Sequence, residues 1–198
     1  PLVDALRQLG ADIEYKGEEG FPPLSIRGKK LEGGLLEIPG NVSSQYISAL
    51  LLIGPALQKG LVLKLSGDIV SRPYIDLTLH VMHEFGIEVD WTDVDTISVA
   101  HQTIEKREYD VESDWSAASY WYEILTLLGD TQSRIALPGL YDGSRQGDSA
   151  VRYLFSMLGV KTVFQKDEKG NEHIPVITLH QRSLQRMSYD FVNQPDLA

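Results

Sequence analysis

The sequence predicts an α/β protein (α+β in some classifications) made of repeated β-α-β-α-β-β units. The first observation is a pattern that occurs three times, in which an apolar helix ends at a glycine and a strand follows. The glycines are Gly10, Gly86 and Gly159, so the pattern recurs at intervals of about 75 residues. The second observation is that hydroxyl-rich segments precede the predicted helices. The helix starts are therefore the places to look for function.

The first complete unit is expected between Gly34 and Ala100. Short alternating apolar runs predict its strands, and longer amphipathic runs predict its helices. The predicted strands are 35–38, 61–65, 87–91 and 96–99, and the predicted helices are 44–57 and 74–85. Gly86 suits the residue that follows a helix, because glycine readily takes a positive φ.

The second unit is expected to repeat this order from Tyr109 onward. The predicted strands are 109–112, 134–137, 160–164 and 176–179, and the predicted helices are 116–128 and 149–158. The turn at 165–172 is charged and contains Gly170, so we expect a mobile tip there.

The two ends of the chain are out of register with the repeat. The sequence opens inside a predicted helix at 2–9 and closes at 193–196, where another helix would begin. The order is therefore half a unit, two full units and the first strand of another. We expect the chain to be a fragment of a longer protein.

Composition excludes several classes of function. The 198 residues include no cysteine, so disulfides, thiolate metal sites and cysteine nucleophiles are excluded. The net charge of −10 argues against a nucleic-acid partner, which would need a basic face. No apolar run is long enough to span a membrane, and we expect a soluble, cytoplasmic protein. His80 and His83 share a predicted helix without an evident third ligand, so we expect no metal and no cofactor.

The first candidate site is Gly40–Tyr46, at the start of a predicted helix. Ser43, Ser44 and Gln45 place two hydroxyls and an amide beside unpaired backbone N–H groups, where the helix dipole favours an anion. A phosphate can be held there without a net positive charge. Taken locally, the favoured interpretation is plainer: Ser43 is an N-cap and Gln45 a first-turn donor.

The second candidate site is Gly67–Asp76, at the start of the next predicted helix. Pro73 fits the first helical position and Ser71 is a candidate N-cap. Arg72 or Tyr74 could reach a phosphate beside this helix start. Capping, with Arg72 as a surface residue, is the alternative that local physics favours.

Three further helix starts follow similar patterns. Ser113–Tyr120 copies the first site with alanine in place of the amide, which favours close packing of the helix. Arg145–Ser149 copies the second site, and Asp148 is expected to be an N-cap. Asp196 follows Pro195 at the start of a helix, where it is either an N-cap or a general base.

Together these segments resemble the 5-enolpyruvylshikimate-3-phosphate synthase family. The matching segments are, in order, Gly40–Tyr46, Gly67–Asp76, Val111–Tyr120, Gln146–Asp148 and Pro195–Ala198. Their order and spacing agree across essentially the whole chain, which makes the resemblance specific. Asn41 stands where a small hydroxyl residue is common and Arg72 where lysine is usual, and neither departure touches the expected chemistry.

The resemblance implies transfer of an enolpyruvyl group from phosphoenolpyruvate to the 5-hydroxyl of shikimate 3-phosphate, with release of phosphate. By analogy, Ser43 and Ser44 hold the 3-phosphate of the shikimate, and Ser71 also binds phosphate. Gln45 lies between the two substrates, and Tyr74 lies against the shikimate.

The resemblance also implies the catalytic residue and the domain organisation. Asp196 would take the proton of the 5-hydroxyl, a role that suits a carboxylate within hydrogen-bond reach. Family members have two domains, each built from three such units as an inside-out α/β barrel, with substrates in the cleft between them. Residues 1–111 would belong to the N-terminal domain and residues 112–198 to the C-terminal domain of a monomer.

In the family, the cations that neutralise phosphoenolpyruvate lie outside these residues. The acidic balance of the chain agrees with that arrangement. We therefore expect the 198-residue chain alone to be inactive.

Three other functions fit the repeat architecture. A UDP-N-acetylglucosamine enolpyruvyl transferase shares the fold, but the segment Ser43–Tyr46 favours the shikimate enzyme. A non-catalytic scaffold would carry helix starts that are simply capped. An RNA-end cyclase is disfavoured by the acidic charge.

Overall fold

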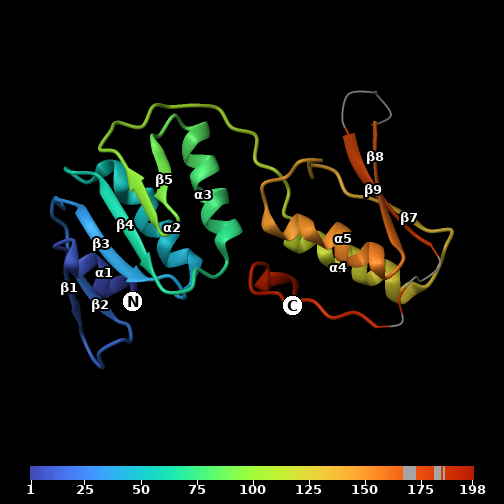
Figure 1. Cartoon of the computed structure of the whole chain (residues 1–198), viewed down its shortest axis with the longest axis horizontal. Coiled ribbons are helices and arrows are strands. Elements are labelled where there is room, and N and C mark those ends of the chain that lie inside the picture. Colours follow the sequence, from blue (N-terminus) through green and yellow to red (C-terminus); the bar gives the residue numbers. More distant parts are fainter. Residues whose placement is uncertain (167–172, 181–183, 185) are drawn as a thin grey trace. The chain divides into compact units, whose positions relative to one another are not determined.

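The computed structural model describes residues 1–166, 173–180, 184 and 186–198. The described chain divides into two compact units, Pro1–Glu108 and Tyr109–Ala198. Figure 1 shows the helices and strands of each unit in chain order. Among the described residues, no helix has the length and apolar character needed to cross a membrane.

The first unit begins with one helix and a pair of strands. Helix α1 spans Leu2–Gln8, strand β1 spans Asp12–Tyr15 and strand β2 spans Leu24–Arg27. The two strands pair antiparallel. The helix predicted at 2–9 is confirmed, and Gly10 after it has φ 93°.

The first unit continues with the complete repeat. Its elements are β3 (Gly34–Pro39), α2 (Ser44–Ile53), the 3-10 helix η1 (Gly54–Ala56), β4 (Leu61–Ser66), α3 (Arg72–Glu84), β5 (Val89–Asp93) and β6 (Thr96–Val99). The sheet order is β3-β4-β6-β5, with β3 and β4 parallel and β6 antiparallel to both of its neighbours. The predicted β-α-β-α-β-β order is confirmed for this unit.

Helix α2 is shorter than predicted. We expected it to run over 44–57, but it ends at Ile53 and the 3-10 helix η1 follows. Pro55 lies inside η1 and has no backbone N–H to continue the α-helical hydrogen bonds. The expectation overlooked this proline.

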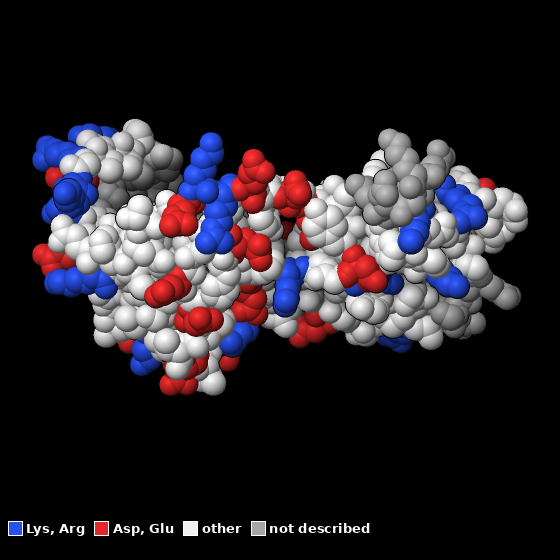
Figure 2. All heavy atoms as spheres, turned by 90° about the horizontal axis from the view of Figure 1, so that it is seen from above, with Lys and Arg blue, Asp and Glu red and all other residues white. Residues whose placement is uncertain are grey.

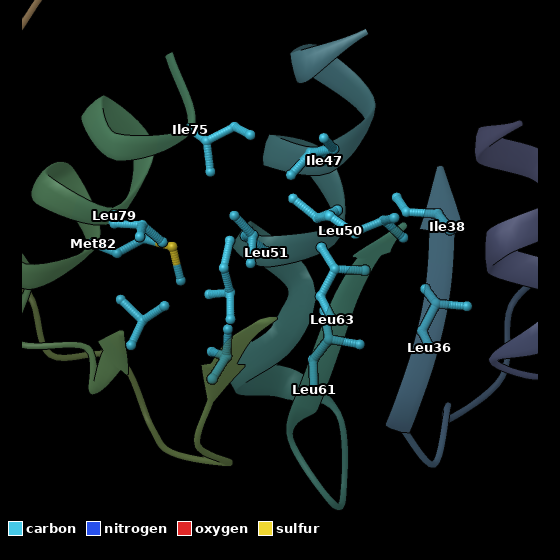
Figure 3. Packing of buried hydrophobic residues seen from close by; sticks show 14 of the residues in the cluster. Leu36, Ile38, Ile47, Leu50, Leu51, Leu61, Leu63, Ile75, Leu79 and Met82 are labelled. Atoms are coloured by element: carbon cyan, nitrogen blue, oxygen red, sulfur yellow. The ribbon is translucent and has the colours of Figure 1, made fainter. Parts of the chain in front are cut away.

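The four-stranded sheet buries one face against α2 and α3. Along β4, Leu61, Leu63 and Leu65 are buried while the residues between them are exposed, because alternate side chains of a strand face opposite sides. Figure 3 shows Leu61 and Leu63 facing the apolar side chains of the two helices. The labelled helix residues are Ile47, Leu50 and Leu51 of α2 and Ile75, Leu79 and Met82 of α3. This packing fixes both helices on the sheet, and with them the places where they begin.

The second unit has a similar order. Its elements are α4 (Trp115–Leu128), β7 (Arg134–Ala136), the 3-10 helix η2 (Gly147–Ala150), α5 (Val151–Met157), β8 (Val160–Lys166), β9 (His173–Leu179) and the 3-10 helix η3 (Pro195–Leu197). The sheet order β7-β9-β8 corresponds to the order β4-β6-β5 of the first unit. Its core contains the fully buried rings of Trp115 and Tyr122.

The strand predicted at 109–112 does not form, so that expectation is wrong. Val111 is 82% exposed, and the segment buries no apolar face that could hold a strand on the core. Strand β7 has three residues and pairs only with β9 among the described strands. The segment is held instead at its end, where Ser113 N–H donates to Gly139 O at 2.7 Å.

The turn predicted at 165–172 is tested only in part. Gln165 and Lys166 are the last residues of β8, so the strand extends further than expected. Residues 167–172, where a mobile tip was expected, lie outside the described residues.

Candidate functional site

The parallel pairing of β3 and β4 brings two helix starts side by side. The strands end opposite each other, at Pro39 and Ser66. Beyond them, Gly40 N–H donates to Ser66 O at 2.7 Å, and Val70 N–H donates to Gly40 O at 3.3 Å. A Cβ atom on Gly40 would lie 2.9 Å from Asp68 O, so this close approach requires glycine. The loops that lead into α2 and α3 are therefore in direct contact.

The two helices also touch one turn from their starts. Thr78 Oγ1 donates to Tyr74 O at 2.9 Å, so Ser48 is the donor in the 2.7 Å hydrogen bond between the Ser48 and Thr78 hydroxyls. Both helices follow parallel strands and run in the same direction. One turn earlier on the same helix faces stand Ser44 and Tyr74. The structure therefore brings Ser44 and Tyr74 to neighbouring positions at the helix starts.

Ser43 is the N-cap of α2, as predicted. Its Oγ accepts a hydrogen bond from Gln45 N–H at 3.3 Å, and its own O–H remains available as a donor. Ser43 and Gln45 are exposed, and Ser44 is half-buried. The hydroxyls and the amide of this segment are thus open to solvent, as a site for a soluble anion requires.

Ser71 occupies the N-cap position of α3 but does not cap it with its side chain, contrary to the expectation. Its backbone is left-handed, with φ 54° and ψ 33°, and it is the only non-glycine residue with positive φ among those described. Ser71 is only 9% exposed, and its carbonyl accepts from Tyr74 N–H at 3.1 Å. A strained residue at the start of a helix is a frequent feature of binding sites.

Arg72 points away from this helix start. Its guanidinium stacks over the ring of Trp91 with its central carbon 3.9 Å from the ring centroid. One of its N–H groups donates to Val94 O at 3.2 Å. The suggestion that Arg72 could reach a phosphate beside Ser71 is not supported by this conformation, and Tyr74, which is half-buried, remains as the other candidate.

The helix starts of the second unit are also linked to each other. Asp114 is the N-cap of α4 and accepts from Ser116 N–H at 2.8 Å. Ser116 Oγ donates to the carboxylate of Asp148 at 3.0 Å, and Asp148 is 3% exposed. Asp148 lies inside η2, whose N-cap is Gln146, so the prediction that Asp148 is an N-cap is wrong. Ala118 is buried in the core of this unit, which agrees with the packing role expected of the small residues.

Glu112 is a residue that sequence reasoning missed. Its carboxylate accepts four hydrogen bonds, from Trp115 Nε1 at 2.8 Å, Tyr141 N at 2.8 Å, Ser144 Oγ at 2.7 Å and Gln146 Nε2 at 3.2 Å. These partners come from the start of α4 and from a loop about 30 residues further along the chain. Nothing in the local pattern around Glu112 indicates a partner at that distance.

Asp196 lies in η3 as the second residue, and its side chain is exposed. The N-cap of η3 is Gln194, so the alternative that Asp196 is itself the N-cap is wrong. Leu197 packs against the core of the second unit and fixes this segment.

The described residues contain no cluster of three or more histidine or acidic side chains that could hold a metal. Figure 2 shows one face of the molecule, on which acidic and basic side chains are interspersed. The donors of the candidate site are hydroxyls, an amide and backbone N–H groups, all of them neutral.

Comparison with solved structures defines the class of fold. EPSP synthase from Acinetobacter baumannii matches with a TM-score of 0.63 and 24% identity, over 92% of this chain and 39% of that protein. The enolpyruvyl transferase NikO from Streptomyces tendae matches with a TM-score of 0.54 and 15% identity, over 90% of this chain and 41% of that protein. The chain therefore has the mixed α/β fold of the enolpyruvyl transferases.

Comparison with sequences defines the family. The model of the family described as EPSP synthase (3-phosphoshikimate 1-carboxyvinyltransferase) matches residues 1–193. The 3-phosphoshikimate 1-carboxyvinyltransferase of Bacteroides fragilis strain YCH46 is 50% identical over 197 residues, which is 100% of this chain and 46% of the relative. That of Marinomonas sp. strain MWYL1 is 39% identical over 165 residues, 82% of this chain and 38% of the relative. The chain belongs to the EPSP synthase family, and it spans about half the length of the curated relatives it matches.

Proposed function

We propose that the protein containing this chain transfers the enolpyruvyl group of phosphoenolpyruvate to the 5-hydroxyl of shikimate 3-phosphate and releases phosphate. Family membership supports this assignment. The observation that carries it is the contact between the two loops after β3 and β4, which brings the hydroxyl-rich starts of α2 and α3 together. Shikimate 3-phosphate presents a phosphate and ring hydroxyls, and such a pair of helix starts has donors for both.

In this proposal the phosphate of shikimate 3-phosphate is held by Ser43 and Ser44, and Ser71 also donates to phosphate. Each serine hydroxyl can donate one hydrogen bond to a phosphate oxygen. The dipole at the start of α2 adds a partial positive charge. Gln45 N–H and Tyr46 N–H already donate to Ser43, so the serine hydroxyls are the main donors of this site. Ser43 is exposed and Ser44 is half-buried, so a ligand from solution can reach both hydroxyls, which supports this role.

Gln45 and Tyr74 are proposed to orient the substrates. Gln45 is exposed next to the two serines, and its amide can donate to one substrate while accepting from the other. Tyr74 stands one turn before Thr78 on the helix face that contacts α2. Its ring can therefore lie against the carbon ring of the shikimate.

Asp196 is proposed as the base that takes the proton of the 5-hydroxyl. The hydroxyl oxygen bonds to the enolpyruvyl carbon, and the C–O bond between that carbon and phosphate breaks, so that phosphate leaves with the electron pair of that bond. A positioned carboxylate contributes roughly 10²- to 10⁴-fold to such a step. Replacement by asparagine would keep the shape of the side chain and remove its basicity. The proposal further assigns 1–111 to the N-terminal domain and 112–198 to the C-terminal domain of a monomeric, cytoplasmic enzyme without a nucleic-acid partner.

The test uses the full-length protein that contains this chain. Calorimetry should detect binding of shikimate 3-phosphate, and an assay of released phosphate should detect turnover with phosphoenolpyruvate. Ser44→Ala and Ser71→Ala should each weaken binding of shikimate 3-phosphate about tenfold, because each removes a donor to a charged group. Ser98→Ala is the matched control, since Ser98 lies in β6 at a distance along the chain from both helix starts.

Two results would overturn this assignment. One is the absence of binding and turnover in a protein that is folded. The other is turnover of UDP-N-acetylglucosamine in place of shikimate 3-phosphate, which would assign the chain to the related sugar-nucleotide enzyme. If Ser98→Ala lost as much activity as Ser71→Ala, the loss in Ser71→Ala would not be due to removal of a phosphate donor.

A further inference from the structure

One aromatic ring holds two side chains from the start of α3. Trp91, in β5, lies under the guanidinium of Arg72 at 3.9 Å. The Nε1–H of the same ring donates to Asp76 Oδ1 at 2.8 Å. Arg72 and Asp76 stand one turn apart on α3, so they share one face of the helix. We call these three residues the α3 clamp.

A second bond of Arg72 fastens the clamp to the β5–β6 hairpin. Its terminal N–H donates to Val94 O at 3.2 Å, and Val94 belongs to the turn between the two strands. Stacking of a planar guanidinium on an indole combines dispersion with cation–π attraction, and a lysine ammonium cannot reproduce both. The first turn of α3 is therefore attached to a neighbouring strand as well as to the sheet core.

The clamp lies next to Ser71, the one described non-glycine residue with a positive φ. Ser71 precedes Arg72 directly and holds a left-handed backbone without a capping side-chain bond. A residue in this conformation persists only where its surroundings fix it. On one side Val70 N–H donates to Gly40 O at 3.3 Å, and on the other side Arg72 belongs to the clamp.

We infer that Arg72, Asp76 and Trp91 are positioning residues for the candidate phosphate site, because they hold Ser71 in its left-handed conformation. This inference rests on the proposed function, because it assumes that Ser71 binds phosphate. Arg72 contributes to anion binding through the conformation of Ser71 and not through its own charge.

The variants separate the parts of the clamp. Trp91→Leu removes both the ring and its N–H, whereas Trp91→Phe keeps a ring beneath Arg72. Arg72→Lys keeps the charge and removes the planar stack. Asp76→Asn keeps an acceptor oxygen for Trp91 Nε1–H and is the conservative variant that should behave like the unsubstituted protein. Arg27→Lys is the matched control, since Arg27 is 73% exposed and far from α3 in the chain.

The first measurement needs no ligand. Amide hydrogen exchange at Tyr74, whose N–H donates to Ser71 O, reports whether the start of α3 holds its conformation. Trp91→Leu and Arg72→Lys should speed this exchange about three- to tenfold, and Asp76→Asn and Arg27→Lys should leave it unchanged. Unchanged exchange in Trp91→Leu would overturn the inference whatever the protein binds.

The second measurement is a double-mutant cycle in the full-length protein, with shikimate 3-phosphate in the calorimeter. Trp91→Leu should weaken binding about tenfold when Ser71 is present. In the Ser71→Gly background, where the hydroxyl is gone, the same substitution should have almost no further effect. Equal effects in both backgrounds would show that Trp91 does not act through Ser71. Failure of the unsubstituted protein to bind this ligand would refute the proposed function, and the exchange measurement would still decide on the clamp.

Discussion

Ser71 combines an unfavourable backbone conformation with a proposed binding role. For an L-residue the left-handed region costs roughly 1–2 kcal/mol, and β-branched residues tolerate it least. Because Ser71 has φ 54°, we predict that Ser71→Val lowers the free energy of unfolding by about 2 kcal/mol. Ser71→Ala should change it by less than about 1 kcal/mol, because the backbone cost is retained and no capping bond is lost. Urea unfolding of both variants measures the difference.

Ser98 provides the control for this prediction. It lies in β6, where the backbone is extended and β-branched residues are favoured. Ser98→Val is therefore expected to be neutral or slightly stabilising. A loss of stability at Ser98 as large as the loss at Ser71 would argue against a conformational cause.

Tyr122 is a buried titratable residue of the second unit. Burial raises the pKa of its phenol above the usual value of 10.0, although a hydrogen bond with Thr162 Oγ1 at 2.8 Å opposes this. As pH rises above 10, the unfolded chain releases this proton before the folded chain does, so the free energy of unfolding falls. We predict that Tyr122→Phe makes stability less dependent on pH in that range. Unfolding in urea between neutral and strongly alkaline pH tests the slope.

Tyr120 supplies the comparison, because it is 66% exposed on the same helix. Tyr120→Phe should leave the alkaline slope as it is in the unsubstituted chain. If Tyr120→Phe and Tyr122→Phe flattened the slope equally, burial of Tyr122 would not be its cause.

At the scale of elements, Gly60 fixes where β4 begins. Its φ is 65°, and a Cβ atom there would lie 2.3 Å from Val99 O at the end of β6. Gly60→Ala therefore forces a strained backbone and a displaced strand, and we predict a loss of at least about 2 kcal/mol in the free energy of unfolding. Gly17→Ala is the control, since its added Cβ meets nothing within 4 Å, and it should be nearly neutral. Thermal unfolding of the two variants would distinguish them.

The elements that sequence alone predicted are those with a strong local signal. Alternating Leu61, Leu63 and Leu65 specify β4, and Gly86, with φ 74°, marks the end of α3. The order of strands and helices in the complete unit was predicted from alternating apolar residues in the strands and amphipathic runs in the helices. The segments that carry the candidate site were also visible, because hydroxyls before an apolar run are typical of helix starts.

The elements that sequence did not predict depend on distant partners. Residues 109–112 resemble a strand locally, but the segment buries no apolar face. Whether a segment is buried depends on distant residues, so the local pattern could not show it. Asp148 resembles an N-cap, yet it accepts from Ser116, which is 32 residues away. The left-handed backbone of Ser71 has no local sequence signal, and its neighbour Arg72 stacks on Trp91 in another element.

At the scale of the molecule, each unit has a core of its own. The two clusters of buried residues share no member, and Leu63 belongs only to the first. Leu63→Ala should destabilise the first unit by about 2–5 kcal/mol, the usual cost of a cavity in a packed core. Amide exchange should rise across 1–108 and stay unchanged in the core of the second unit, around Leu125. A uniform rise across both units would show that they unfold together.

Net charge leads to a last prediction for the whole chain. The chain carries −10, the proposed donors are neutral, and Arg72 is stacked on Trp91, yet both proposed substrates are anions. Each helix start offers only about half a positive charge, which cannot offset two polyanionic ligands in an acidic protein. We predict that the 198-residue chain, verified as folded by amide exchange, releases no measurable phosphate, whereas the full-length protein turns over. Turnover by the chain at a rate near that of the full-length protein would mean that neutral donors alone are sufficient, and would remove the need for cations from the rest of the protein.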